Sequence, residues 1–211
     1  MNILIESIRN PRIQREDIDN LEDSLKELTY DVPIKSEKII LIKPADYINP
    51  TFAASEEGTQ LKEKVIAFID LIIVESLLGD SNLKTQSIDL ITFKGNKYLQ
   101  FKLENANVFN SLKMNKYDIG KNIFDETIRK ILTPLNQYIS DPEVFYGYDI
   151  QIIGYTKSFT DEDASPESIE YRFIMPQETV RKYKDKDISG QRLLDESIIL
   201  MDDERIELKL Q

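Results

Sequence analysis

Cysteine is absent from this sequence of 211 residues. A chain without cysteine forms no disulfide, offers no thiol nucleophile and holds no Cys-ligated zinc or iron–sulfur cluster. Histidine is absent as well, so the chain lacks the side chain that most often exchanges protons near neutral pH and binds transition metals. Ser-His-Asp hydrolysis, His-dependent zinc sites and His-ligated haem are excluded. Catalysis would rest on Asp, Glu, Lys, Tyr or Ser, with oxygen-bound ions such as Mg²⁺, Mn²⁺ or Ca²⁺.

Glycine is also scarce, with seven residues scattered along the chain, and no G-x-x-x-x-G-K-[ST] phosphate loop occurs. We therefore predict no bound cofactor. The sequence has no run of about 18 apolar residues, and residues 1–31 lack the apolar segment of a signal peptide. These absences predict no membrane span and a cytoplasmic location. An exported chain from which a signal has been removed would show the same pattern.

Basic residues are fewer than acidic ones, and the net charge is −11. This charge makes nucleic acid and anionic membranes unfavourable partners. The apolar fraction of 41% is large enough for a core, and the length suits one domain. We expect a single domain over residues 1–211, in which residues 1–50 form either part of that domain or an N-terminal helical arm with a short strand.

The remaining patterns predict an α+β fold. Helical spacing of apolar residues and alternation in strands indicate elements that are joined by turn residues. The expected elements are a helix at 16–28, a strand at 38–42, a loop at 44–57, a helix at 57–78 ending at Gly79, strands at 87–94 and 97–104 joined by Gly95-Asn96, a helix at 118–139 kinked or divided at Pro134, strands at 144–159 and 168–175, a short helix after Pro176, and a hairpin turning at Asp202-Asp203. Mostly antiparallel hairpins with two main helices packed on them account for this order.

Two acids, Asp70 and Glu75, interrupt the apolar run of the helix at 57–78. At about 100° per residue they point about 140° apart, so they cannot jointly hold a proton or an ion. We interpret both as charges on the border of a core-facing helix. On the wetter side, Leu71, Val74 and Leu78 form an apolar ridge. It packs either under another part of the chain, which we favour, or against a second copy in a homo-oligomer.

The predicted hairpin gathers polar side chains on one face. With Gly95-Asn96 as a two-residue turn, Asp89 lies directly opposite Lys102, and Gln100 lies beside them. An Asp opposite a Lys is an ordinary cross-strand ion pair. The same three side chains, taken together, are also a candidate catalytic site.

Asp89 on one strand with Gln100-x-Lys102 on the next resembles the active-site pattern of the PD-(D/E)xK nuclease superfamily, over residues 57–155 at most. The resemblance implies metal-assisted phosphodiester hydrolysis, in which acids hold Mg²⁺ or Mn²⁺ and the lysine orients or activates water. The preceding helix would supply a further acid, Glu63, Asp70 or Glu75. The metal candidates are thus Asp89, Asp70 and Glu63, and Gln100 stands where the family pattern has an acid.

The absences and the candidate sites lead to three hypotheses for function. We favour a non-enzymatic binding or accessory module whose partner is a protein or a small ligand. The alternative is the divalent-metal-dependent phosphodiesterase or nuclease with Asp89, Gln100 and Lys102. The third is a homo-oligomeric structural protein that associates through Leu71, Val74 and Leu78.

Overall fold

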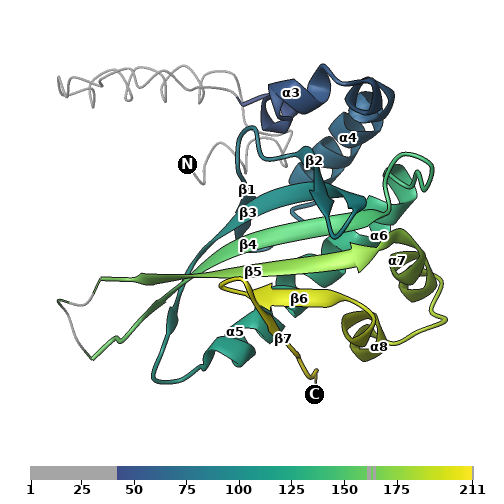
Figure 1. Cartoon of the computed structure of the whole chain (residues 1–211). Coiled ribbons are helices and arrows are strands. Elements are labelled where there is room, and N and C mark those ends of the chain that lie inside the picture. The colour runs from purple at the N-terminus through teal and green to yellow at the C-terminus, as the bar shows by residue number, and fades with distance from the viewer. Residues whose placement is uncertain (1–41, 161–162, 164, 211) are drawn as a thin grey trace, which may run out of the picture. The chain divides into compact units, whose positions relative to one another are not determined.

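A computed structural model describes residues 42–160, 163 and 165–210 (Figure 1). The helix expected at 16–28 and most of the strand expected at 38–42 lie outside the described residues. The described residues belong to one compact unit. Its elements are η1 (Pro44–Tyr47), α3 (Pro50–Ala53), α4 (Glu56–Val74), β1 (Ser81–Leu83), β2 (Asp89–Phe93), β3 (Asn96–Asn110), α5 (Lys116–Ile123), η2 (Phe124–Ile128), α6 (Arg129–Tyr138), β4 (Gly147–Lys157), β5 (Glu167–Pro176), α7 (Gln177–Lys184), α8 (Gly190–Asp195), β6 (Ile198–Met201) and β7 (Glu204–Ile206).

The strands form one mixed sheet in the order β1-β3-β4-β5-β6-β7, and β2 also pairs with β3. Because β4 occupies one side of β3, β1 and β2 lie one after the other along its other side. Every neighbouring pair is antiparallel except β3 and β4, which are parallel and joined by α5, η2 and α6. A parallel pair requires such a crossover. The predicted α+β class with a mostly antiparallel sheet is confirmed.

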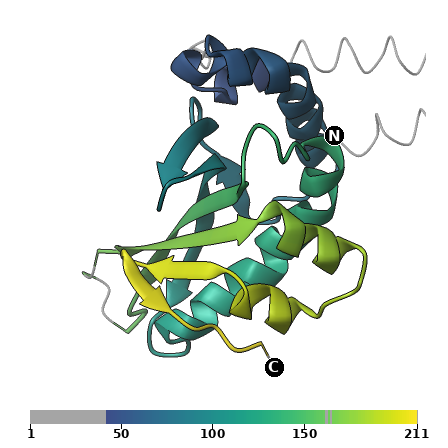
Figure 2. The same ribbon diagram turned by 45° about the vertical axis from the view of Figure 1, so that its right-hand side comes forward.

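The helices α4 to α8 lie on one side of the sheet, and no helix in the described part of the chain covers the other side (Figures 1 and 2). Alternate strand residues face the helices and are buried there: Leu99, Phe101 and Leu103 in β3, Tyr148, Ile150 and Ile152 in β4, and Tyr171, Phe173 and Met175 in β5. Burying each such side chain stabilises the fold by roughly 1.5–3 kcal/mol. The uncovered side, hereafter the open face, carries the intervening residues.

Helix α4 packs its apolar stripe on the sheet through five buried residues, which are Leu61, Val65, Phe68, Ile69 and Ile72. Ser55 caps its start by accepting the Gly58 N–H at 2.9 Å. The helix ends at Val74, before the expected Gly79. The apolar pattern continues past this end because the chain after the helix is buried again at Leu78. The prediction was too long because it counted Leu78 with the apolar residues of the helix, whereas Leu78 is buried in the segment that follows the helix.

Two further expectations about helices are corrected. The stretch 44–57, expected as loop, contains η1 and α3, which begin at Pro44 and Pro50. Proline is favoured at a first helical position because its missing N–H has no partner there. Pro134 does not divide its helix, and α6 continues through it. The irregularity falls earlier, in the π-helical turn η2, where the Thr127 hydroxyl donates to the Leu78 carbonyl at 3.2 Å.

The turn between β2 and β3 is Lys94-Gly95, so the expected Gly95-Asn96 is wrong by one residue. Both turn residues have positive φ, 48° at Lys94 and 83° at Gly95, as a two-residue turn matched to strand twist requires. Phe93 consequently pairs with Asn96, and Asp89 lies directly opposite Gln100 instead of Lys102. The partner of each β2 residue moves by two positions, which leaves the side chains on the predicted faces of the sheet.

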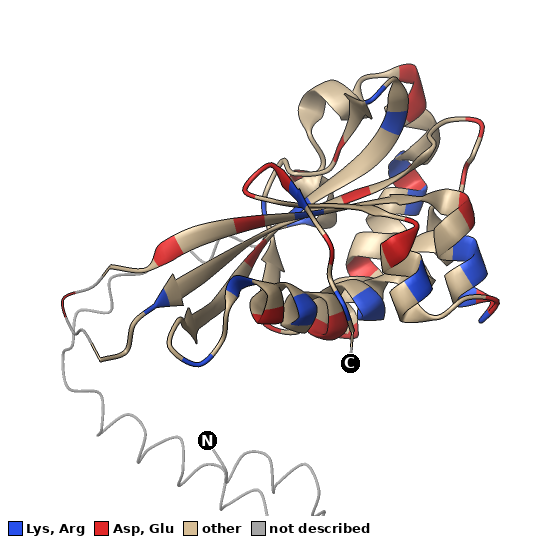
Figure 3. Ribbon diagram, turned by 60° about the horizontal axis from the view of Figure 1, so that its bottom comes forward, with Lys and Arg blue, Asp and Glu red and all other residues tan. Residues whose placement is uncertain are grey.

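Other predicted strands are confirmed. The strands expected at 144–159 and 168–175 are β4 and β5, and they pair along ten positions. The final hairpin turns at Asp202-Asp203, where φ is 50° and 66°. Acidic and basic residues are interleaved on the outer surfaces of the helices (Figure 3), with ion pairs between Asp125 and Arg129 in η2–α6 and between Glu178 and Arg181 in α7.

Candidate functional site

The outer side of β2 is an edge of the sheet with backbone groups that point away from β3. At its start the chain's own segment pairs with this edge: the Ile88 N–H donates to the Tyr47 carbonyl at 3.0 Å, and the Asn49 N–H donates to the Ile88 carbonyl at 2.9 Å. Antiparallel ladders alternate the direction of successive backbone groups. Leu90 and Thr92 therefore direct their N–H and C=O groups outward, as Ile88 does.

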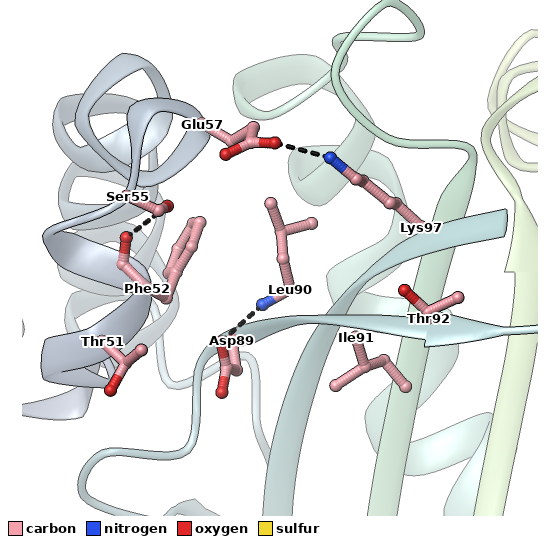
Figure 4. A pocket seen from close by; sticks show the side chains of 9 residues that line it. All are labelled: Thr51, Phe52, Ser55, Glu57, Asp89, Leu90, Ile91, Thr92 and Lys97. Carbon is pink, nitrogen blue, oxygen red and sulfur yellow. Dashed lines mark hydrogen bonds and ion pairs between the residues drawn. The ribbon is translucent and has the colours of Figure 1, made fainter.

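The chain segment that pairs with Ile88 turns away at Pro50 and forms α3. Beyond that point a hollow of about 230 Å³ lies between β2 and the α3–α4 corner, with Phe52 on one wall and Leu90 on the other (Figure 4). Its complete lining is Thr51, Phe52, Ser55, Glu57, Asp89, Leu90, Ile91, Thr92 and Lys97. The volume is below the roughly 300–1,000 Å³ of small-molecule pockets, and it suits a protein side chain better than a cofactor.

The α3–α4 corner is held in place by close packing at Gly58. A Cβ at this position would lie 1.7 Å from the Phe52 carbonyl oxygen, so only glycine fits. The Ser55 hydroxyl donates to the same carbonyl at 2.7 Å. These contacts fix the backbone at Phe52, whose side chain is only 3% exposed and forms one wall of the hollow.

Asp89 covers part of the β2 edge. Its Oδ1 accepts the outward Leu90 N–H at 2.8 Å (Figure 4). Within the described residues the Asp89 carboxylate makes no ion pair with a lysine or arginine. A charged side chain at an exposed edge discourages indiscriminate strand pairing. Asp89 therefore leaves three outward backbone groups for a partner, the Leu90 carbonyl and the N–H and carbonyl of Thr92.

Lys97 of β3 donates to Glu57 at the start of α4 at 2.5 Å and spans the mouth of the hollow (Figure 4). This hydrogen bond is the main reason that the pKa of Glu57 lies below its usual value. The pair is exposed, so its contribution to stability is small. Its position nevertheless links the first turn of α4 to the hairpin that carries the edge.

A buried charged cluster supports the open face beside this edge. Asp149 of β4 is fully buried and accepts from Gln100 Nε2 at 2.7 Å. It also accepts from Arg172 of β5, from Nη2 at 2.7 Å and Nε at 3.3 Å. The hydrogen bond with Asp149 is the main cause that raises the pKa of Arg172. A charge that is buried in this way is stable only while its partners are present.

Aromatic rings close over this cluster from the β2–β3 hairpin. The Arg172 guanidinium lies 5.7 Å from the centre of the Phe93 ring. The Tyr98 ring contacts Phe93 and Tyr146 edge-on, at centroid distances of 6.2 and 5.6 Å. Gly147 leaves room for Tyr98, because a Cβ there would lie 2.9 Å from the ring. Burial is the main reason that the pKa of Tyr98 is raised.

The three residues that were predicted as a site on the hairpin lie on one face of the sheet but do not form a single cluster. Asp89, Gln100 and Lys102 share the open face, but the Gln100 amide is bonded to Asp149, and Lys102 is exposed two residues farther along β3. Glu63 and Asp70 are exposed on α4. Within residues 42–160, 163 and 165–210, no group of three or more acidic side chains is placed to hold a metal ion.

Sequence reasoning missed Asp149 and Arg172. Both residues lie in strands that were correctly predicted and that pair with each other. The available signal was therefore an acid in one apolar strand and a base in the neighbouring strand. The hollow itself had no sequence signal, because α3 was expected as loop.

The apolar ridge predicted on α4 is not continuous. Leu78 is 9% exposed and belongs to the core, whereas Val74 is 77% exposed. Association through Leu71, Val74 and Leu78 stays a prediction. None of the described helices is long and apolar enough to cross a membrane.

Comparisons with models of protein families, with curated proteins and with solved structures give no significant match for this chain.

Proposed function

We propose that this protein is a binding module that receives an extended segment of a partner protein along the outer edge of β2. One observation carries the proposal: the outward backbone groups of Leu90 and Thr92 lie beside a hollow with apolar walls. A peptide that adds a strand to a sheet edge obtains affinity from main-chain hydrogen bonds and selectivity from pockets for alternate side chains. The β2 edge offers both elements.

The chain already uses this mode of pairing at the start of the edge. Its segment at Ile48 pairs with Ile88 in parallel orientation and then leaves at Pro50. An incoming segment would continue the row of hydrogen bonds at Leu90 and Thr92. The α3–α4 corner stands beside the edge, which favours a single extended segment over a second complete sheet.

Replacing Thr92 with proline tests the proposal. Proline is tolerated in edge strands where its missing N–H faces outward, so Thr92→Pro removes one docking donor without removing a ladder bond to β3. The matched control is Arg205→Pro in β7, which lies at the opposite edge and whose N–H also faces outward by the alternation from the Asp202-Asp203 turn.

The measurement is selection of a displayed library of random hexapeptides against the whole protein. We expect enriched sequences with wild type and Arg205→Pro, and their loss with Thr92→Pro. Amide NMR shifts on adding an enriched peptide should centre on residues 88–93. Equal enrichment with Thr92→Pro, or shifts confined to another surface, would contradict strand addition at β2.

A second candidate is the metal-dependent phosphodiesterase, because Asp89 directly faces Gln100 and Lys102 shares their face. Titration with Mg²⁺ and Mn²⁺, followed by amide NMR of wild type and Asp89→Asn, tests it. Saturable shifts at residues 89, 100 and 102 that disappear in Asp89→Asn support this candidate. Their absence removes it.

A further inference from the structure

We infer that the partner segment alternates basic and apolar residues, with a basic side chain against Asp89 and the adjacent apolar side chain in the hollow beside Phe52. This inference rests on the proposed strand addition at β2 and specifies the chemistry of the partner.

The charge preference follows from Asp89. One of its oxygens accepts the Leu90 N–H, and the carboxylate has no cationic partner within the described residues. Of the neighbouring cations, Lys97 pairs with Glu57 at 2.5 Å and Arg172 pairs with Asp149 at 2.7 Å, and Lys102, which shares the open face, makes no ion pair with Asp89. A lysine or arginine on an added strand would supply the missing positive charge beside a half-buried carboxylate.

The apolar preference follows from the alternation of side chains. Successive residues of a strand point to opposite faces, so Asp89 lies on the open face while Leu90 points toward the α3–α4 corner. The partner residue opposite Leu90 would point the same way, into the hollow between Leu90 and Phe52. The residue before or after it would then lie beside Asp89. Basic and apolar residues must therefore be neighbours in the partner sequence.

The length of the segment is also limited. The chain's own pairing at Ile88 closes one end of the edge, and the Lys94-Gly95 turn closes the other. Only the five residues of β2 remain for docking. The partner therefore needs a short extended stretch and not a folded sheet.

The experiment measures the binding of three capped, fluorescein-labelled peptides to the whole protein: Ser-Lys-Val-Lys-Val-Ser, Ser-Glu-Val-Glu-Val-Ser and Ser-Lys-Ser-Lys-Ser-Ser. The proteins are wild type, Asp89→Asn, Thr92→Pro and the control Glu207→Gln, which removes an exposed acid near β7. Asparagine retains an oxygen for the Leu90 N–H and removes only the charge.

With wild type and Glu207→Gln, we expect the Lys–Val peptide to bind at least about threefold more tightly than each of the other two. Asp89→Asn should remove most of its advantage over the Glu–Val peptide and leave its advantage over the Lys–Ser peptide. Added salt should weaken Lys–Val binding to wild type more than to Asp89→Asn.

Two results separate the inference from the function on which it rests. Equal binding of the Lys–Val and Glu–Val peptides, abolished by Thr92→Pro, would overturn the inferred chemistry and leave strand addition intact. Lys–Val binding that is unchanged in Thr92→Pro, or no binding of any of the three peptides, would contradict docking at β2 and the inference together.

Discussion

The two edges of the sheet differ in how they meet solvent. At one edge, β7 has only three residues, and Glu204 and Arg205 are exposed. Shortness and charge are the usual devices that keep an edge strand from pairing with other chains. At the other edge, β2 has five residues, one carboxylate at Asp89 that covers part of the edge, and a hollow beside it with Phe52 and Leu90 on its walls. This difference between the two edges is the reason that we propose docking at β2 and not at β7.

The largest expected effect concerns the charged cluster that supports the β2 edge and has no counterpart at β7. Arg172→Ala leaves the Asp149 carboxylate fully buried without its cation, so we expect a loss of about 3–5 kcal/mol in the free energy of unfolding. Urea denaturation measures it. Substituting both partners, as Arg172→Met with Asp149→Leu, should cost much less. An equal loss in both proteins would show that packing, and not the unpaired charge, dominates.

A second substitution, at Gly58, displaces the helix that carries the Phe52 wall of the hollow. Gly58→Ala places a Cβ where the Phe52 carbonyl oxygen lies, 1.7 Å away, so α3 must move from α4. We expect a loss of roughly 3 kcal/mol, at the upper end of overpacking effects, together with loss of peptide binding at β2. Thermal unfolding and the peptide titration check both results. Gly154→Ala is the matched control, because its Cβ would lie 3.5 Å from its nearest neighbour, an ordinary contact distance.

Substitutions in the turns of the two edge hairpins should change the free energy of unfolding by smaller amounts and in opposite directions. Gly95 at φ 83° forms the turn at β2, and Asp203 at φ 66° forms the turn at β7. Gly95→Ala should destabilise by about 1 kcal/mol, whereas Asp203→Gly should stabilise by roughly 0.5–1 kcal/mol, because positive φ is costly for residues with a Cβ. Denaturation midpoints of the two variants decide this. Changes of the same sign would contradict the assigned turn geometry.

The smallest effect is a pH dependence at the mouth of the hollow. The hydrogen bond from Lys97 lowers the pKa of Glu57 below its usual value. A lowered carboxyl pKa contributes stability that is present above the unfolded-state pKa and is lost as pH falls through the folded-state pKa. Carbon-detected NMR titration of Glu57 should therefore give a higher midpoint in Lys97→Met than in wild type. Identical midpoints would show that the pair does not persist in solution.

Periodicity was sufficient to predict the class of the fold, strands β4 and β5 and the final hairpin, because these depend on which side chains are buried. The strand expected at 97–104 is longer than predicted, because β3 continues to Asn110. The register of β2 against β3 depended on the turn between them. Lys94 takes positive φ there, which is uncommon for lysine. The turn is therefore Lys94-Gly95, and the residue opposite Asp89 is Gln100 and not the predicted Lys102. Asp149 and Arg172 were missed because the partners of Asp149, Gln100 of β3 and Arg172 of β5, come together only when the three strands are assembled. The short helix α3 has too few residues for a periodic pattern, so the hollow beside it was not predicted.

The parallel pairing of β3 with β4 has a consequence for how the chain folds. The antiparallel pairs β2–β3, β4–β5 and β6–β7 join neighbouring segments, so their loops close at little entropic cost. The parallel pair β3–β4, by contrast, joins strands that are separated by residues 111–146, which contain α5, η2 and α6. Contacts between segments distant in sequence slow folding, so we expect this junction to form late. Until it forms, the β2–β3 hairpin lacks its contacts with Asp149 and Arg172, so the strand addition that we propose would require the completed fold.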